Sequence, residues 1–299
     1  MIDGAGGWLA IALRFVAFTA TTGALGAWAF HRFVLPRVPV TADAAERQGW
    51  QALAVRAATW CSIAVAVTAL VRSQVPGSAL PSGPDAVERL FNSITWTIAL
   101  HAQAVVAGLA AIFLAMRARP QTAWPIGAEA SVIALALIPP ALAHAGSAHE
   151  LQGVAYLVDV VHGAAAGAWV GGLALLTLLV ARTRWADGGA AAAAALFAGF
   201  HPVAMVAAPT VFATGLTSAW LRMGVPEGIA SSSYSGLFVA KLLLAGVVGF
   251  IGAGHSKLAT RRASAIRPDT VGRSLLGECV FALIVLLVTA VLVGTPPIG

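Results

Sequence analysis

The stretch 156–172 reads YLVDVVHGAAAGAWVGG, and its apolar character decides the fold. The apolar run continues on both sides, so a helix built from it is long enough to cross the roughly 30 Å hydrocarbon core of a bilayer. Two ionisable residues, Asp159 and His162, nevertheless lie three residues apart within it. Glycines then recur at every fourth position, at Gly163, Gly167 and Gly171. The stretch therefore predicts a membrane-buried helix with one polar, closely packed face.

The composition extends this prediction to the whole chain. Of 299 residues, 59% are hydrophobic and 10% are charged, whereas soluble domains contain about 25% charged residues. This leaves no room for a separate soluble domain, and we expect one integral membrane domain over residues 1–299. The net charge of +6 comes from residues in short loops between apolar runs. It indicates orientation in the bilayer rather than nucleic-acid binding.

Apolar runs of the length that a spanning helix needs, about 20 residues, occur eight times. They predict an all-α polytopic helix bundle with eight transmembrane helices. The expected spans lie near 8–34, 50–72, 94–116, 125–143, 153–181, 196–221, 236–257 and 273–293.

The distribution of positive charge predicts the orientation of these spans. The loops after the odd-numbered spans hold 12 of the 18 Lys and Arg residues, whereas the loops after spans two, four and six hold three. Positive residues accumulate on the cytoplasmic side of membrane proteins. Both termini are therefore expected on the periplasmic side.

With this topology the histidines divide into an outer and an inner group. His101 and His162 lie at similar depth in spans three and five, and His144 and His149 lie where span four ends in ALAHAGSAHE. The inner ends of three other spans carry the remaining histidines, His31, His201 and His255.

Asp159 and His162 are the strongest candidates for a site. On a helix they share a face with Gly163, and the glycine row predicts close approach of another helix. Ionisable groups inside a membrane are costly and by default indicate function. A carboxylate beside an imidazole can orient it for a metal. The alternative is that Asp159 pairs with Arg14 or Lys241 and only fixes the packing.

No motif of a soluble enzyme occurs in the sequence. HExxH, the P-loop, GxSxG and paired cysteines are all missing, so we expect no catalytic activity. Cys61 and Cys279 each lie in an apolar span and are expected as buried small side chains. The methionines form no MxxM pattern. A metal site is therefore expected to use mainly imidazole.

Six segments resemble, in order, the CopD copper-resistance family. The segment LVDVVHGAAAGAWVGGLALL at 157–176 resembles the family's hallmark helix. The other segments are RFVAFTATTGALGAWAF at 14–30, LAHAGSAHE at 142–150, ATGLTSAW at 213–220, YSGLFVAKLLLAGVVGFIGAGHSKL at 234–258 and GECVFALIVLLVTAVLVGTPP at 277–297. The similarity extends over nearly the whole chain.

The resemblance implies a protein of the bacterial inner membrane that moves copper from the periplasm toward the cytoplasm. A periplasmic copper chaperone is the implied partner, besides the ion and the lipid. Carried over by position, the resemblance points to His144, Asp159, His162, Trp169, Lys241 and Glu278. The expected metal ligands are His101, His144, His149, His162 and Asp159. Further candidates along a transport path are His31, His201, His255, Lys241, Glu278 and Trp169.

Two other functions remain open at this point. The first is electron transfer through haem b held between two histidines, because His101 and His162 lie at matching depth on different helices. The second is a non-catalytic membrane scaffold in which the ionisable residues serve packing alone.

Overall fold

The computed structural model describes residues 5–38, 44–74, 86–116, 124–143, 151–183, 189–223, 233–259 and 268–295. These ranges contain helices and no strand, as the all-α prediction requires. In chain order the elements are α1 (Ala5–Ala29), η1 (Phe30–Val34), η2 (Leu35–Arg37), α2 (Ala44–Gln74), α3 (Ala86–Ala115), α4 (Ile126–Ala143), α5 (Gln152–Ala166), η3 (Gly167–Gly171), α6 (Gly172–Thr183), α7 (Gly189–Met223), α8 (Ser233–Ala259) and α9 (Pro268–Leu292).

Seven helical segments in these ranges are long and apolar enough to cross a membrane. They coincide with seven of the eight expected spans. The remaining one, α4, contributes only a shorter apolar helix, Ile126–Pro140. Large apolar side chains cover the outside of the bundle; Phe250 is 82% exposed and Trp60 is 69% exposed. Such a surface needs lipid around it, so the protein is a multi-pass membrane protein.

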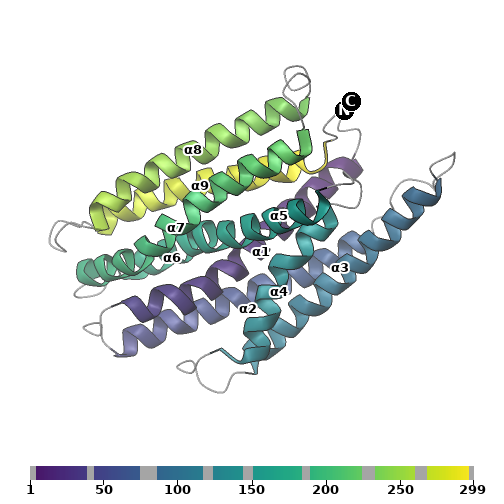
Figure 1. Ribbon diagram of the computed structural model, residues 1–299. Coiled ribbons are helices and arrows are strands. Elements are labelled where there is room, and N and C mark those ends of the chain that lie inside the picture. Colours follow the sequence, from purple (N-terminus) through teal and green to yellow (C-terminus); the bar gives the residue numbers. More distant parts are fainter. Residues whose placement is uncertain are drawn as a thin grey trace.

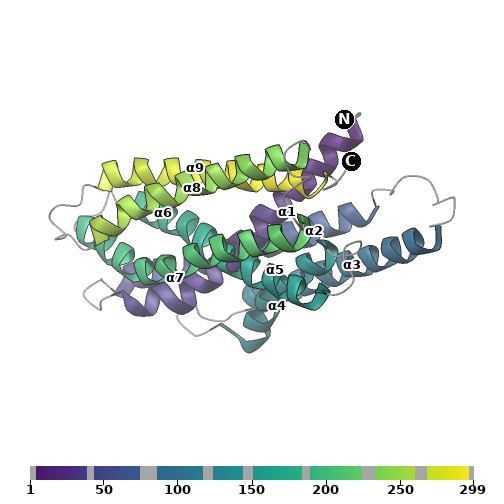
Figure 2. The same ribbon diagram turned by 45° about the horizontal axis from the view of Figure 1, so that its top comes forward.

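Helix α1 lies in the middle of the bundle (Figure 1). It packs against α2, α4, α6, α9 and η3, while α8 and α9 pack as a pair and α5 packs on α7. Figure 2 shows α8 and α9 along one side of the bundle and α3 with α4 along the opposite side. The main core, which includes Phe30, Leu173, Leu176 and Leu196, is fully buried around α1, α6 and α7.

The fifth expected span is not one regular α-helix. Residues Gly167–Gly171 form a π-helical turn, η3, between α5 and α6. A Cβ on Gly171 would overlap the carbonyl of Thr22, and a Cβ on Gly26 would overlap the backbone of Gly171. The backbones of α1 and η3 therefore touch, as the small residues predicted.

The glycine row is only partly confirmed. A Cβ on Gly167 would lie 2.5 Å from Cβ of Leu25, but a Cβ on Gly163 would meet no atom within 4 Å. Gly163 is therefore not part of the close contact, and its inclusion in the row was wrong. The π-turn is the physical reason, because its i→i+5 bonds turn the segment after Ala166 relative to α5.

Helix α4, although short, connects opposite ends of its neighbours. A Cβ on Gly127 would touch the ring of Phe113, near the end of α3. Farther along α4, the carbonyl of Leu137 accepts a hydrogen bond of 2.8 Å from the hydroxyl of Tyr156, near the start of α5. The helix therefore extends from the last turns of α3 to the first turns of α5.

Helix α7 starts earlier than the expected span at 196–221. It begins at Gly189 and contains Pro202 and Pro209. His201 therefore lies 12 residues after the first residue of the helix, about 18 Å along its axis. Its expected place near the inner end of the membrane-spanning part of α7 stays a prediction.

Candidate functional site

The side chain of Asp159 points from α5 toward α7. The hydroxyl of Ser218 donates a hydrogen bond of 2.6 Å to Oδ1 of Asp159. Asp159 is partly buried, which places its carboxylate between two helices instead of in lipid. The sequence expectation that this residue faces the bundle is met by this contact.

His162 lies one turn farther along α5 and contacts the same helix. Its Nδ1 is 3.1 Å from Oγ1 of Thr214. The hydroxyl of Thr214 donates in turn to the carbonyl of Thr210, at 2.5 Å. Because that proton is used, the contact fits the tautomer in which Nδ1–H of His162 donates to the hydroxyl oxygen and Nε2 carries the lone pair. Of the two ring nitrogens, Nε2 is the one that can bind a cation.

Gly215 makes room for this imidazole. A Cβ at this position would lie 3.3 Å from Cε1 of His162. The segment TGLTS at 214–218 therefore supplies a hydroxyl for His162, a gap for its ring and a hydroxyl for Asp159. We call Asp159, His162, Thr214 and Ser218 the outer site. Thr214 and Ser218 were not among the residues expected to form a site, although a Thr and a Ser one turn apart signal a polar helix face.

His101 is placed elsewhere. It is exposed on α3, and its Nδ1 donates to the carbonyl of Thr97 in the same helix, at 2.8 Å. Helix α3 packs on α2 and α4, whereas α5 packs on α7. Across the described ranges, no three His, Cys, Asp or Glu side chains are grouped so that they could hold a metal. His101, Asp159 and His162 therefore do not form one ligand cluster.

Two expected ligands, His144 and His149, lie outside the described residues. His255 belongs to α8, but its side chain also lies outside the description.

His31 is in the π-turn η1, where its ring packs on Trp124 with centroids 5.3 Å apart. Lys241 is partly buried on α8. Arg14, one expected partner of Asp159, extends to the end of α9, where a Cβ on Gly294 would overlap its guanidinium.

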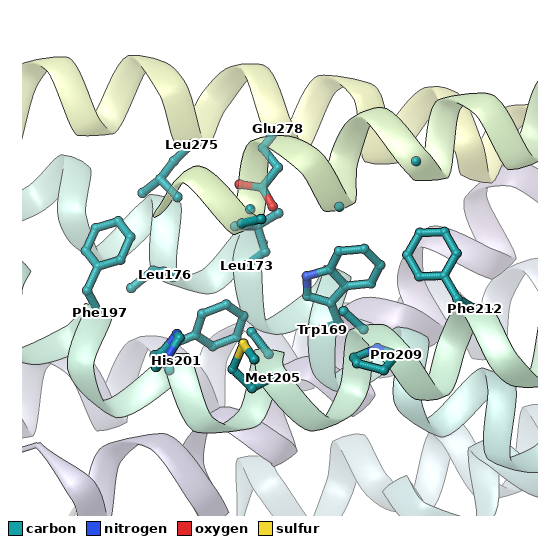
Figure 3. A pocket seen from close by; sticks show the side chains of 17 residues that line it. Trp169, Leu173, Leu176, Phe197, His201, Met205, Pro209, Phe212, Leu275 and Glu278 are labelled. Carbon is teal, nitrogen blue, oxygen red and sulfur yellow. The ribbon is translucent and has the colours of Figure 1, made fainter. Parts of the chain in front are cut away.

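The other three path candidates line one cavity of about 490 Å³ (Figure 3). Trp169 comes from η3, His201 from α7 and Glu278 from α9, and Glu278 is only 1% exposed. Met205, which was not expected as a site residue because the methionines form no MxxM pattern, also lines it. The signal that identifies Met205 is its spacing of four from His201, which places both on one helix face. We call this space the α7–α9 cavity.

The fold and these polar groups define a class: a multi-pass membrane protein with ionisable side chains turned into its bundle. Residues 194–292 match the family model of Copper resistance protein D, CopD. The match covers the part of the chain that forms α8, α9 and most of α7, and this part is similar to the copper-resistance family CopD. No significant match was found among curated proteins or solved structures.

Proposed function

We propose that the protein binds copper at the periplasmic side of the bacterial inner membrane and moves it toward the cytoplasm. The observation that carries the proposal is the outer site, where Asp159 and His162 turn away from lipid and toward Thr214 and Ser218. The match of α7, α8 and α9 to the copper-resistance family supports copper as the ion. The whole chain, 1–299, acts as one membrane domain.

The chemistry of the outer site suits the first step of such a path. A cation that leaves water needs ligands that replace its hydration shell. The imidazole Nε2 of His162 can bind copper, and the carboxylate of Asp159 supplies negative charge one turn away. Thr214 and Ser218 hold the two groups in position from the neighbouring helix. A periplasmic copper chaperone is the proposed donor.

The test compares copper binding and stability in two variants of the outer site. Asp159→Asn keeps the shape of the side chain and removes its charge, and we expect copper affinity to fall by about 10–100-fold with an unchanged melting temperature. His162→Ala removes a ligand and should cost at least as much. Copper titration and thermal melting of the purified full chain measure both.

The matched control is His101→Ala, which removes an exposed imidazole from α3 and should leave the affinity unchanged. If Asp159→Asn keeps its affinity but melts at a sharply lower temperature, Asp159 serves packing and the proposal loses its site. Copper that accumulates in proteoliposomes carrying wild type but not His162→Ala would support transport.

A further inference from the structure

Two arginines lie at a similar level of the bundle, Arg14 on α1 and Arg72 on α2. The two helices run in opposite directions (Figure 1), and a Cβ on Gly23 of α1 would lie 2.7 Å from Sγ of Cys61 of α2. Arg14 precedes Gly23 by nine residues, and Arg72 follows Cys61 by eleven. Both therefore lie roughly 14–17 Å from this contact, toward the end where α1 begins. Their positive charges repel each other. We call Arg14 and Arg72 the arginine pair.

The surroundings of the arginine pair attract cations without supplying a full negative charge. The guanidinium carbon of Arg72 lies 5.5 Å from the centre of the Trp96 ring on α3. Nη1 of Arg14 lies against the end of α9, where a Cβ on Gly294 would overlap it. An aromatic face and the carbonyl end of a helix each stabilise a cation modestly. Neither one cancels the charge of an arginine.

The hydrogen-bond donors of the arginine pair are also still available. A guanidinium group has five N–H donors. Within the ranges that the structure describes, neither Arg14 nor Arg72 makes a hydrogen bond or an ion pair. Arg47, by contrast, donates to the carbonyl of Val38 at 2.6 Å. Since Arg14 and Arg72 are both partly buried, an anion between them would satisfy donors and remove the repulsion.

The level of the pair matches the headgroup region of a bilayer. Arg72 lies two residues before the end of the span Ala45–Gln74, and Trp96 lies three residues after the start of the span Ser93–Ala115. Tryptophan is enriched at the membrane interface, and a long arginine side chain near a helix end reaches toward the headgroups. The span of α1 has 31 residues, about 46 Å, and is longer than the roughly 30 Å hydrocarbon core. Arg14, seven residues inside this span, therefore lies near the edge of the core.

We propose that the arginine pair binds the phosphate group of an anionic phospholipid. Guanidinium groups bind phosphate oxygens through paired, charge-assisted hydrogen bonds. The apolar surface beside the pair suits the acyl chains, because Leu70 and Val71, next to Arg72, are 49% and 41% exposed. Bound lipid would hold the outer ends of α1 and α2 together where their charges alone push them apart. This inference concerns a lipid and goes beyond the proposed copper function.

The test is thermal melting of the purified full chain in detergent, titrated with phosphatidylglycerol. The lipid should raise the melting temperature of the wild type until the site is saturated. We expect the apparent affinity to fall at least about tenfold in Arg72→Gln and in Arg14→Gln, because a hydrogen bond to a charged group contributes about that much. The matched control is Arg182→Gln, since Arg182 is exposed in the last turn of α6. This control should keep the wild-type affinity.

Two other ligands identify the source of the phosphate. Phosphatidylcholine has the same phosphate and acyl chains, but its positive choline group cancels the charge. Inorganic phosphate has the charge without the chains. We expect neither to stabilise the wild type as much as phosphatidylglycerol at equal concentration. Equal stabilisation by inorganic phosphate would show an anion site that does not recognise lipid, and equal stabilisation by phosphatidylcholine would show that the charge of the pair is not used. Either result would overturn the inference.

A comparison of stabilities with and without lipid separates binding from packing. If Arg72 only packs on Trp96, Arg72→Gln should lower the melting temperature equally in both conditions. If the pair binds phosphate, the loss should be larger with phosphatidylglycerol, because only then does the wild type gain the free energy of binding. An equal loss in both conditions, or an unchanged affinity in Arg14→Gln and Arg72→Gln, would refute the lipid site. No copper is present in these measurements, so their outcome does not depend on the proposed function.

Discussion

The outer site is held by interhelical hydrogen bonds rather than by ion pairing alone. Asp159 accepts from Ser218 at 2.6 Å, and His162 contacts Thr214 at 3.1 Å. From the sequence we expected Asp159 to orient the imidazole of His162. In the structure Nδ1 of the imidazole faces Thr214, so an interaction with a carboxylate or a metal is left to Nε2. At the scale of single residues, α7 therefore determines how α5 presents its polar groups.

Removing the hydroxyl of Ser218 should measure this support directly. We expect Ser218→Ala to lower the free energy of unfolding by about 0.6 kcal/mol and by no more than about 1.7 kcal/mol, the range for interhelical hydrogen bonds in membranes. The control is Thr217→Ala, because Thr217 is exposed and bonds only to the carbonyl of Ala213 in its own helix, at 2.9 Å. Unfolding in mixed detergent micelles gives both values. Equal stability of the two variants would show that the Ser218–Asp159 bond contributes nothing.

Residue spacing predicted some contacts of the site and could not predict others. The position of Asp159 and His162 on a bundle-facing surface followed from the cost of ionisable groups in lipid. The hydroxyls that hold them lie more than 50 residues away in sequence, and only the packing of α5 on α7 brings them together. Met205 was set aside because no MxxM pattern was present, although its spacing from His201 already placed the two on one face.

At the scale of elements, the π-turn η3 is the feature that the sequence did not predict. Glycines at every fourth position fit a regular α-helix, and the spacing alone contains no sign of an extra residue in the turn. In the structure the segment before the turn faces α7 through Asp159 and His162, while the glycines within it face α1. The turn thus allows one span to make a polar interface with α7 and then a backbone contact with α1. π-turns inside helices frequently occur at functional sites.

The contact between α1 and η3 predicts a clear difference between two glycines of the same span. Gly171→Ala would push a methyl group into the carbonyl of Thr22, and we expect a loss of about 1–3 kcal/mol in the free energy of unfolding, as for an overpacked core. Gly163→Ala meets no atom within 4 Å. It should be neutral or stabilising by up to about 1 kcal/mol, because alanine favours helix over glycine. Thermal melting of both variants in detergent decides the matter, and equal melting temperatures would argue against the close contact.

At the scale of the whole molecule, the charge pattern and the packing of α4 both bear on the number of membrane crossings. Seven long spans alone would place the two termini on opposite sides of the membrane, whereas eight crossings place them on the same side. The contacts of α4 with Phe113 at one end and with Tyr156 at the other make it a connection between opposite ends of the bundle. Figure 1 shows the start of α1 and the end of α9 at the same end of the bundle. Both observations favour eight crossings, with α4 as the short one.

Reporter fusions test this topology and its direction together. We expect fusions after residue 299 and within 144–150 to report the periplasm, because the loops after the odd-numbered spans carry 12 of the 18 Lys and Arg residues. A fusion within 117–120, before α4, should report the cytoplasm. If the fusions at 117–120 and 144–150 report the same side, α4 does not cross. A cytoplasmic signal from the C-terminal fusion would instead reverse the direction. The outer site would then face the cytoplasm, and the proposed uptake would become export.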